Sequence, residues 1–455
     1  MSALPRPVGR PLLMMVTLLV AGCGDPVDVT APTVFITSPA TGIAVSHGTP
    51  LRLAGSATDP QDGALPDDAL VWTSSIDGEL GTGPEVDFEA PSVGLHTLTL
   101  SATDRDGNVG SASVSVSVEQ LAFLDGTIDD PQIGIVVNST ANAIRLFQLG
   151  DPTETRSIAL GASSAVTATG ITVRGERAVV PLGNAASVAI LDLRSLTIES
   201  FFLFASGNAT GSAFVDDEVV IVANQETDEV GAFSLGQADP AISRTTVVAS
   251  FPTDIVTISD SLVLVVSGNL DDAYMPAGEG VVTAIDPRTM AVIDTVHTGG
   301  TNPQLADLGP DGMVYVVNTG DYVAPSTMAI IDPVAMVRTG LVEGLPPGSG
   351  DVHAGGDGLV YVSAFFTGTV VWDPGSESFV RGAGDPVCAP LQGGGCRGAF
   401  GAHTAADGSL YQVFFGSPAE DLAPAIFHYE AGTFALQDST DAGPGPVGLE
   451  IRSFR

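Results

Sequence analysis

Short runs of alternating apolar and polar residues fill the first part of the chain, and turn residues separate them. A period of two residues, with turn signals about every ten residues, is typical of the strands of a β-sandwich. Asp-Pro and Asp-Gly pairs supply the turns. We therefore expect a β-sandwich over residues 32–120, with strands at Thr33–Thr37, Leu51–Ala57, Ala69–Ser74, His96–Ala102 and Ser111–Val118.

The rest of the chain, 121–455, repeats one apolar strand seven times. The copies begin at residues 134, 177, 218, 261, 312, 358 and 408. A second apolar strand follows each copy, and in four copies it ends at an aspartate: Asp192, Asp286, Asp332 and Asp373. Repeats about 46 residues long that contain several strands are typical of β-propeller blades. The pattern predicts a propeller of seven blades over 121–455.

The two ends of this repeat region complete one another. A further strand precedes copies two to seven, and copy one has none before it. The sequence PVGLEIRSF at 446–454 supplies the missing strand. We expect the C-terminal strand to complete the first blade, which leaves the ring without open edges.

Composition supports an all-β chain and excludes some classes of binding partner. The chain has 455 residues with 54 Gly and 31 Pro, which favours many turns over long helices. Its 53 acidic residues exceed 16 basic ones, giving a net charge of −37, and every basic residue is arginine. The absence of lysine excludes a P-loop lysine and Schiff-base chemistry. The acidity argues against nucleic acid and against electrostatic binding to anionic lipid.

The first 23 residues form a separate segment. Arg6 and Arg10 precede a short apolar run, and Val20-Ala21-Gly22-Cys23 follows it. The segment resembles the bacterial lipoprotein signal, and the run is too short to span a membrane. The resemblance implies cleavage before Cys23 and lipidation of Cys23. The residues that follow, GDPVDVTA at 24–31, are interpreted as a short flexible tether. An ordinary secretory signal that contains a cysteine is the alternative.

This resemblance also predicts where the protein is located. Gly24, rather than Asp, follows Cys23, and among lipoproteins this favours sorting to the outer membrane. We expect a protein of the cell envelope that meets the membrane only through its lipid anchor. Whether it faces the periplasm or the outside stays open.

Both predicted domains resemble known bacterial modules. APTVFITSP at 31–39, LVWTSS at 70–75 and GLHTLTLSATDRDGNVGSASVSV at 94–116 resemble immunoglobulin-like and PKD-like domains. YVVN at 315–318 with AIIDP at 329–333 resembles the YVTN-type propeller repeat, and GPDGMVYVVN at 309–318 resembles NHL and streptogramin-lyase blades. These resemblances imply a fold for each region and assign no activity or catalytic residue.

Cys388 and Cys396 are the remaining cysteines, and they flank a glycine-rich loop. In an oxidising compartment such a pair favours a structural disulfide. A redox or metal-binding pair is the alternative, but the spacing does not match the CxxC pattern.

One set of polar residues stands out when the innermost strands of the blades are aligned. Four neighbouring blades carry Asp307, His353, His403 and Glu450 at equivalent positions, and Asp254 and Asp351 lie on the same face two residues earlier. Histidines and carboxylates are ligands for divalent metal ions, and a histidine can also act as a general base. The competing interpretation is that these residues line a solvated central channel. Asp307, His353, His403 and Glu450 are the candidate metal ligands, and a divalent metal ion is the one cofactor considered.

The combined pattern predicts a lipid-anchored envelope protein whose propeller face binds an unknown protein or small-molecule ligand. Loops at 269–280 and 318–327 are candidate binding segments because inserts on one face of a propeller often carry function. No enzymatic activity is required. A metal-dependent lyase or hydrolase at the propeller centre is the first alternative, and a structural, surface-layer-like or adhesive component is the second.

Overall fold

The computed structural model describes residues 30–46, 50–89, 91–119, 132–149, 151–161, 166–391, 394–417 and 421–453. The signal segment, Cys23 and most of the tether lie outside these residues. The chain forms two compact units, and the main division between them falls between Ser117 and Val118, with the short segment Val45–Thr49 grouped with the second unit. The described secondary structure is strand apart from one 3-10 turn, Asp67–Ala69. The expected all-β class is confirmed. No helix among the described residues has the length and apolar character needed to cross a bilayer.

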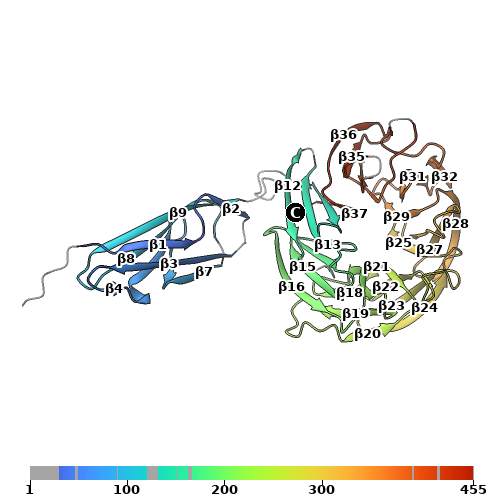
Figure 1. The fold of residues 1–455 in the computed structure, drawn as a ribbon. Coiled ribbons are helices and arrows are strands. Elements are labelled where there is room, and N and C mark those ends of the chain that lie inside the picture. Colours follow the sequence, from blue (N-terminus) through green and yellow to red (C-terminus); the bar gives the residue numbers. More distant parts are fainter. Residues whose placement is uncertain are drawn as a thin grey trace, which may run out of the picture. The chain divides into compact units, whose positions relative to one another are not determined.

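The N-terminal unit consists of two antiparallel sheets (Figure 1). The first contains β1 (Thr33–Ser38), β3 (Leu51–Asp59), β4 (Gly63–Ala64) and β7 (Glu85–Phe88). The second has the order β2 (Ile43–Ser46), β9 (Val109–Glu119), β8 (Gly94–Thr103), β5 (Leu70–Ser74) and β6 (Gly78–Thr82).

The two sheets pack closely against each other. A Cβ on Gly55 of β3 would lie 2.5 Å from Leu100 of β8 and 3.2 Å from the Trp72 ring of β5. Trp72 is fully buried, and its Nε1–H donates to the Gly83 carbonyl at 3.2 Å. The absence of a side chain at Gly55 of β3 therefore lets the Trp72 indole of the opposite sheet pack closely against this strand.

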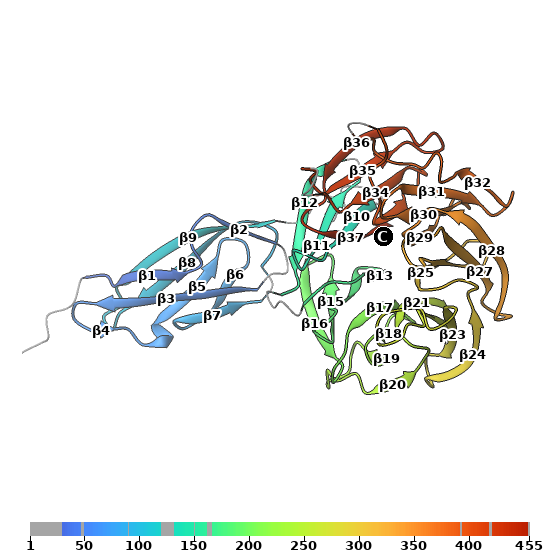
Figure 2. The same ribbon diagram turned by 45° about the vertical axis from the view of Figure 1, so that its right-hand side comes forward.

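The C-terminal unit consists of seven four-stranded antiparallel sheets arranged in a ring (Figures 1 and 2). From the inside outwards, blade one has β37 (Pro446–Ser453), β10 (Gln132–Asn138), β11 (Ala143–Gln148) and β12 (Asp151–Ala159). Blade two has β13 (Thr172–Arg174), β14 (Arg177–Pro181), β15 (Ser187–Asp192) and β16 (Thr197–Leu203). Blade three has β17 (Ala209–Phe214), β18 (Val219–Asn224), β19 (Glu229–Ser234) and β20 (Arg244–Val247).

The remaining four blades repeat this order. Blade four has β21 (Pro252–Ser259), β22 (Leu262–Ser267), β23 (Val281–Asp286) and β24 (Ala291–His297), and blade five has β25 (Pro303–Leu308), β26 (Val314–Asn318), β27 (Ser326–Asp332) and β28 (Val337–Leu345). Blade six has β29 (Ser349–Ala354), β30 (Val360–Ala364), β31 (Gly368–Asp373) and β32 (Ser378–Arg381), and blade seven has β33 (Gly401–Thr404), β34 (Leu410–Phe414), β35 (Ala425–Tyr429) and β36 (Leu436–Asp441).

The C-terminal strand closes the ring. β37 pairs antiparallel with β10, with Glu450 opposite Ile135 and Leu449 opposite Val136. Blade one therefore combines strands from both ends of the repeat region, as the sequence predicted. This pairing covers the inner edge of β10, and β37 becomes the innermost strand of the first blade.

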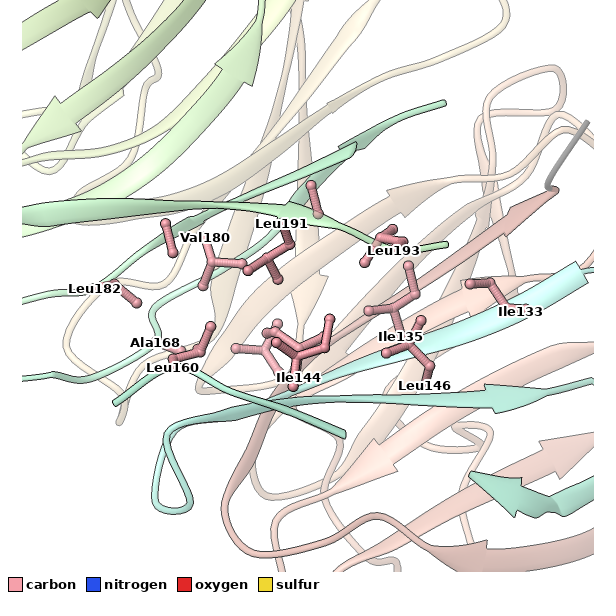
Figure 3. Close-up of a cluster of buried hydrophobic side chains, with 14 residues drawn as sticks. Ile133, Ile135, Ile144, Leu146, Leu160, Ala168, Val180, Leu182, Leu191 and Leu193 are labelled. Carbon is pink, nitrogen blue, oxygen red and sulfur yellow. The ribbon is translucent and has the colours of Figure 1, made fainter. Parts of the chain in front are cut away.

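Seven buried apolar clusters join the blades, one at each boundary around the ring. Figure 3 shows the cluster between blades one and two, which contains Ile133, Ile144, Val180 and Leu191. The last cluster joins blade seven to blade one through Val413 and Val136. Each blade packs against a neighbouring blade on both faces. The sequences of its middle strands are therefore continuously apolar and show no alternation of apolar and polar residues.

Aspartates fix the turns after the third strands. The Oδ1 atoms of Asp192, Asp286, Asp332 and Asp373 each accept the N–H two residues further on, at 2.8–2.9 Å. A short polar side chain that bonds its own turn backbone is the expected role of aspartate at such positions.

Candidate functional site

The six candidate residues all lie on innermost strands. Asp254 is in β21, Asp307 in β25, Asp351 and His353 in β29, His403 in β33 and Glu450 in β37. They therefore occupy blades four to seven and blade one, at the centre of the ring (Figure 2). We call these six side chains the central cluster. The sequence alignment of the inner strands placed them together, and the contacts below show how they are arranged.

The two histidine rings stack on each other. Their centroids are 3.7 Å apart and their planes differ by 26°, and 12% of each side chain is exposed. Thr404 contacts both rings: its Oγ1 lies 2.9 Å from His353 Nε2, and its carbonyl oxygen lies 3.0 Å from His403 Nδ1. A carbonyl only accepts, so His403 Nδ1 carries the hydrogen in this bond. The neutral His403 ring consequently keeps its Nε2 lone pair free.

Each histidine lies near a carboxylate of a neighbouring blade. His353 Nδ1 lies 3.4 Å from Asp307 Oδ2 of blade five. His403 Nε2 lies 3.6 Å from Glu450 Oε2 of blade one. The Arg452 guanidinium also reaches Glu450 Oε2, at 2.9 Å. The centre thus holds two stacked histidines, each near a carboxylate, and Arg452 forms an ion pair with one of these carboxylates, Glu450.

The aspartates also connect neighbouring blades. Asp254 Oδ2 accepts the N–H of Ala306 at 2.9 Å, and Asp307 Oδ2 accepts that of Ala354 at 2.9 Å. Asp351 Oδ2 accepts the N–H of Ala402 at 3.1 Å. Each bond joins one inner strand to the inner strand of the next blade. Sequence reasoning missed this role, because nothing in the pattern reveals a carboxylate bonded to the backbone of another repeat.

Partial enclosure shifts the protonation of this cluster. Burial raises the pKa of Asp254 to about 7, against the hydrogen bonds from Ala306 and Ile255, and the charges of Asp307 and Asp351 add to the rise. Burial likewise raises the pKa of Asp351 to about 7, with Glu450 adding to it and the Ala402 bond opposing it.

The other two shifts have the same main cause. Burial raises the pKa of Glu450, although Arg452 opposes the rise. Burial holds the pKa of His403 well below its usual range, and the charges of His353 and Arg452 lower it further. At neutral pH the cluster therefore contains a neutral His403, with Asp254 and Asp351 close to their midpoints.

The described residues do not bring the candidate metal ligands together as one donor set. Nowhere in that part of the chain do three or more His, Cys, Asp or Glu side chains converge to hold a metal ion. His353 Nδ1 lies near Asp307 and His403 Nε2 lies near Glu450, so each ring has a different carboxylate as its nearest acidic partner. Asp307 Oδ2 is also engaged by Ala354. These residues do not fit a shared metal, and we derive no chemistry through one.

The remaining cysteine candidates lie at the boundary of blades six and seven. Cys388 and Cys396 form a disulfide with Cα atoms 5.5 Å apart, in the connection between β32 and β33. Val387 exchanges backbone hydrogen bonds with Thr369 of β31, which holds this connection against blade six. Cys23 lies outside the described residues.

The fold and the central cluster define a class: an all-β protein with a sandwich unit and a closed, seven-bladed propeller. No protein-family model matches the chain, and no curated protein matches its sequence.

Solved structures do match it. A functionally unknown protein from Desulfotomaculum acetoxidans has a TM-score of 0.53 and 16% identity, covering 71% of this chain and 99% of that one. Hydrazine synthase of Kuenenia stuttgartiensis has a TM-score of 0.50 and 12% identity, covering 65% and 97%. The WD40 β-propeller domain of Doa1 has a TM-score of 0.42 and 9% identity, covering 59% and 82%. At these identities the similarity extends to the fold alone.

Proposed function

We propose that this protein is a lipid-anchored component of the bacterial cell envelope whose propeller binds a ligand or a protein partner. The sandwich acts as a spacer between the anchor at Cys23 and the propeller. A propeller fold suits a binding or scaffold role because its loops form one continuous surface on a rigid ring.

The central cluster is the observation that supports binding. Four carboxylates share this site with one guanidinium, that of Arg452, and with two histidines, of which His403 is held neutral. Perturbed groups of this kind concentrate at functional sites. The inter-blade bonds engage one oxygen of Asp254, Asp307 and Asp351. The other oxygen of Asp254 and of Asp307 accepts a single backbone N–H, at 2.8 Å. Because a carboxylate oxygen has two lone pairs, a polar ligand at the centre would meet those that remain.

The anchor is tested by fatty-acid labelling of the full-length chain in a Gram-negative host. We expect labelled palmitate to enter the wild-type chain and the protein to sediment with membranes. Cys23→Ser is expected to lose both properties. Membrane association of an unlabelled Cys23→Ser chain would contradict lipidation at this residue.

Binding is tested by cross-linking to envelope extract. We expect an envelope component that links to the wild-type chain and is lost in the double variant His403→Gln/Glu450→Gln. Asp294→Asn on the outer strand β24 is the matched control and should retain the link. Equal cross-linking of all three chains would contradict binding at the central cluster.

A further inference from the structure

A row of aromatic side chains crosses three blades of the propeller. It contains Tyr322, Phe365, Phe400 and Phe415, and we call these four the aromatic row. The Tyr322 and Phe365 rings are stacked with centroids 6.2 Å apart. Phe365 lies 4.8 Å from Phe400, and Phe400 lies 5.1 Å from Phe415. Each ring therefore contacts the next, and the row runs continuously from blade five to blade seven.

The row lies on one face of the ring. Tyr322, Phe365 and Phe415 come from the connections between the second and third strands of blades five, six and seven. Phe400 comes from the connection between blades six and seven, just before β33. Because successive strands of a blade run in opposite directions, these two kinds of connection leave the ring on the same face.

Part of this row and its flank is open to solvent. Tyr322 is 43% exposed and the adjoining Phe366 is 67% exposed. The backbone of Tyr322 has φ = +64°, a left-handed conformation that bulky residues rarely adopt. Asp321 Oδ1 secures it by accepting the N–H groups of Val323 and Ala324 at 2.9 and 2.7 Å. The loop thus holds an aromatic ring outward in a strained but hydrogen-bonded conformation.

The aromatic row adjoins the central cluster at Asp351. A Cβ on Gly350 would lie 2.5 Å from Cζ of Phe365, so this ring rests on the residue before Asp351. Phe400 is two residues before Ala402, whose N–H bonds to Asp351. Phe365 therefore packs on the residue next to Asp351 in β29, and Phe400 precedes the strand β33 whose backbone bonds to Asp351.

Charge favours a cationic occupant for this junction. The chain has a net charge of −37, and only 16 of its residues are basic. Aromatic faces elsewhere in blade seven already accept guanidinium groups: Arg397 lies 5.4 Å from the ring centroids of Phe414 and Phe427, and Arg381 lies 5.8 Å from that of Phe434. An aromatic face beside a carboxylate combines cation–π attraction with ion pairing.

We propose that the aromatic row and Asp351 bind an extended, basic segment of polypeptide. Apolar side chains of the segment lie on the rings, and a lysine or arginine reaches the Asp351 carboxylate. A row that spans three blades is long enough for several residues of a chain and exceeds what a single small cation needs. This inference rests on the proposed binding function and names the class of its partner.

The experiment measures peptide binding to the full-length chain, purified in detergent, by fluorescence anisotropy. The probes are dodecapeptides with four repeats of Lys-Leu-Pro, Glu-Leu-Pro or Lys-Ser-Pro. We expect binding of the Lys-Leu-Pro peptide, which weakens as salt is raised, and about tenfold weaker binding of the other two. Near-ultraviolet circular dichroism checks that every variant is folded.

Three variants locate the site. Tyr322→Ala and Asp351→Asn are expected to weaken Lys-Leu-Pro binding about tenfold each. Val334→Ala is the control, because Val334 is 82% exposed and lies in the connection between β27 and β28, on the opposite face. It should bind as the wild-type chain does.

Other results would overturn the proposal. Equal binding of the Glu-Leu-Pro peptide would exclude charge recognition, and equal loss in all three variants would place the site elsewhere. Binding of chitohexaose or choline that depends on Tyr322, without peptide binding, would assign the row to another ligand class. If an envelope component still links through the central cluster while no peptide binds, only this inference fails. If neither binds, the proposed binding function fails with it.

Discussion

Histidines in the two units occupy contrasting environments. His96 in the sandwich has no exposed surface, and both ring nitrogens have partners: Nδ1 lies 2.8 Å from Ser74 Oγ and Nε2 lies 2.5 Å from the Ser92 carbonyl. His353 and His403 in the propeller remain partly exposed, stack on each other and face carboxylates at 3.4 and 3.6 Å. His96 Nδ1 also lies 3.5 Å from Asp77 Oδ2, so a nearby carboxylate is common to both units. The difference is that the sandwich histidine is fully enclosed with a hydrogen-bond partner on each nitrogen, whereas the propeller histidines are partly exposed at the centre of the ring.

This contrast separates a structural histidine from a candidate binding residue. Nε2 of His96 meets a carbonyl and so donates, which leaves Nδ1 to accept from Ser74. Ser74 Oγ in turn accepts the N–H groups of Ile76 and Asp77, both at 3.1 Å. Every polar atom in this small network is used within the sandwich, so no lone pair is left to recognise a ligand. The hydrogen bonds of the central cluster do not form such a self-contained network.

The largest expected effect comes from His96→Ala. The change removes a fully buried ring, leaves a cavity and deprives Ser92 of its donor. We expect the sandwich to lose about 3 kcal/mol of its free energy of unfolding. The chain has two tryptophans, Trp72 and Trp372, so Trp372→Phe leaves Trp72 fluorescence as a reporter of the sandwich during urea unfolding.

His297→Ala is the control for this measurement. His297 ends the outer strand β24 and is exposed, so we expect no more than about 0.5 kcal/mol of change. A loss below 1 kcal/mol in His96→Ala would contradict the contrast, because the sandwich histidine would then be as dispensable as a surface one.

Sequence periodicity predicted the fold well because the fold is repetitive. Seven copies of one strand pattern fixed the number of blades, and the missing strand before copy one placed β37 beside β10. The physical basis is that each blade buries apolar residues on both faces. Every copy of the repeat therefore contains a continuous run of apolar residues. In the sandwich, alternation located five strands but missed the shorter strands β2, β4, β6 and β7, which have two to five residues and so carry little periodic signal.

The site was predictable only in part. Aligning the inner strands found the positions of His353, His403 and Glu450, since equivalent strand positions point to the centre of the ring. It could not find the ring stacking or the separate carboxylate of each histidine, because these depend on side-chain rotamers. The aromatic row also escaped detection, since its members come from loops of different length and share no register.

Asp351→Asn should change how stability depends on pH by a smaller amount. Burial raises the pKa of Asp351 from 3.8 to about 7 in the folded chain. Between these values the folded state holds the proton more tightly than the unfolded state, so stability falls as pH rises and levels off above pH 7. Asparagine carries no charge, and its amide oxygen can still accept from Ala402.

We therefore expect the loss of stability between pH 5 and pH 8 to shrink by about 2 kcal/mol in the variant. Urea unfolding followed through Trp372, in a Trp72→Phe background, measures the change in the propeller. An unchanged slope would show that Asp351 is ionised at both pH values and that the cluster is better neutralised than its geometry indicates.

The smallest effect is expected from His403→Gln, and it has the opposite sign. Burial and the charges of His353 and Arg452 keep the pKa of His403 well below 6.5. As pH falls through 6.5, His403 becomes protonated in the unfolded chain but stays neutral in the folded chain. The wild-type propeller therefore loses stability on acidification. Glutamine cannot titrate and can still donate to the Thr404 carbonyl.

Between pH 6.5 and 5.5 the His403→Gln variant should lose about 1 kcal/mol less of its free energy of unfolding than the wild-type chain, measured again through Trp372. If both chains lose the same amount, His403 is protonated in the folded state and pairs with Glu450 as an ion, and the propeller histidines would then be as fully partnered as His96.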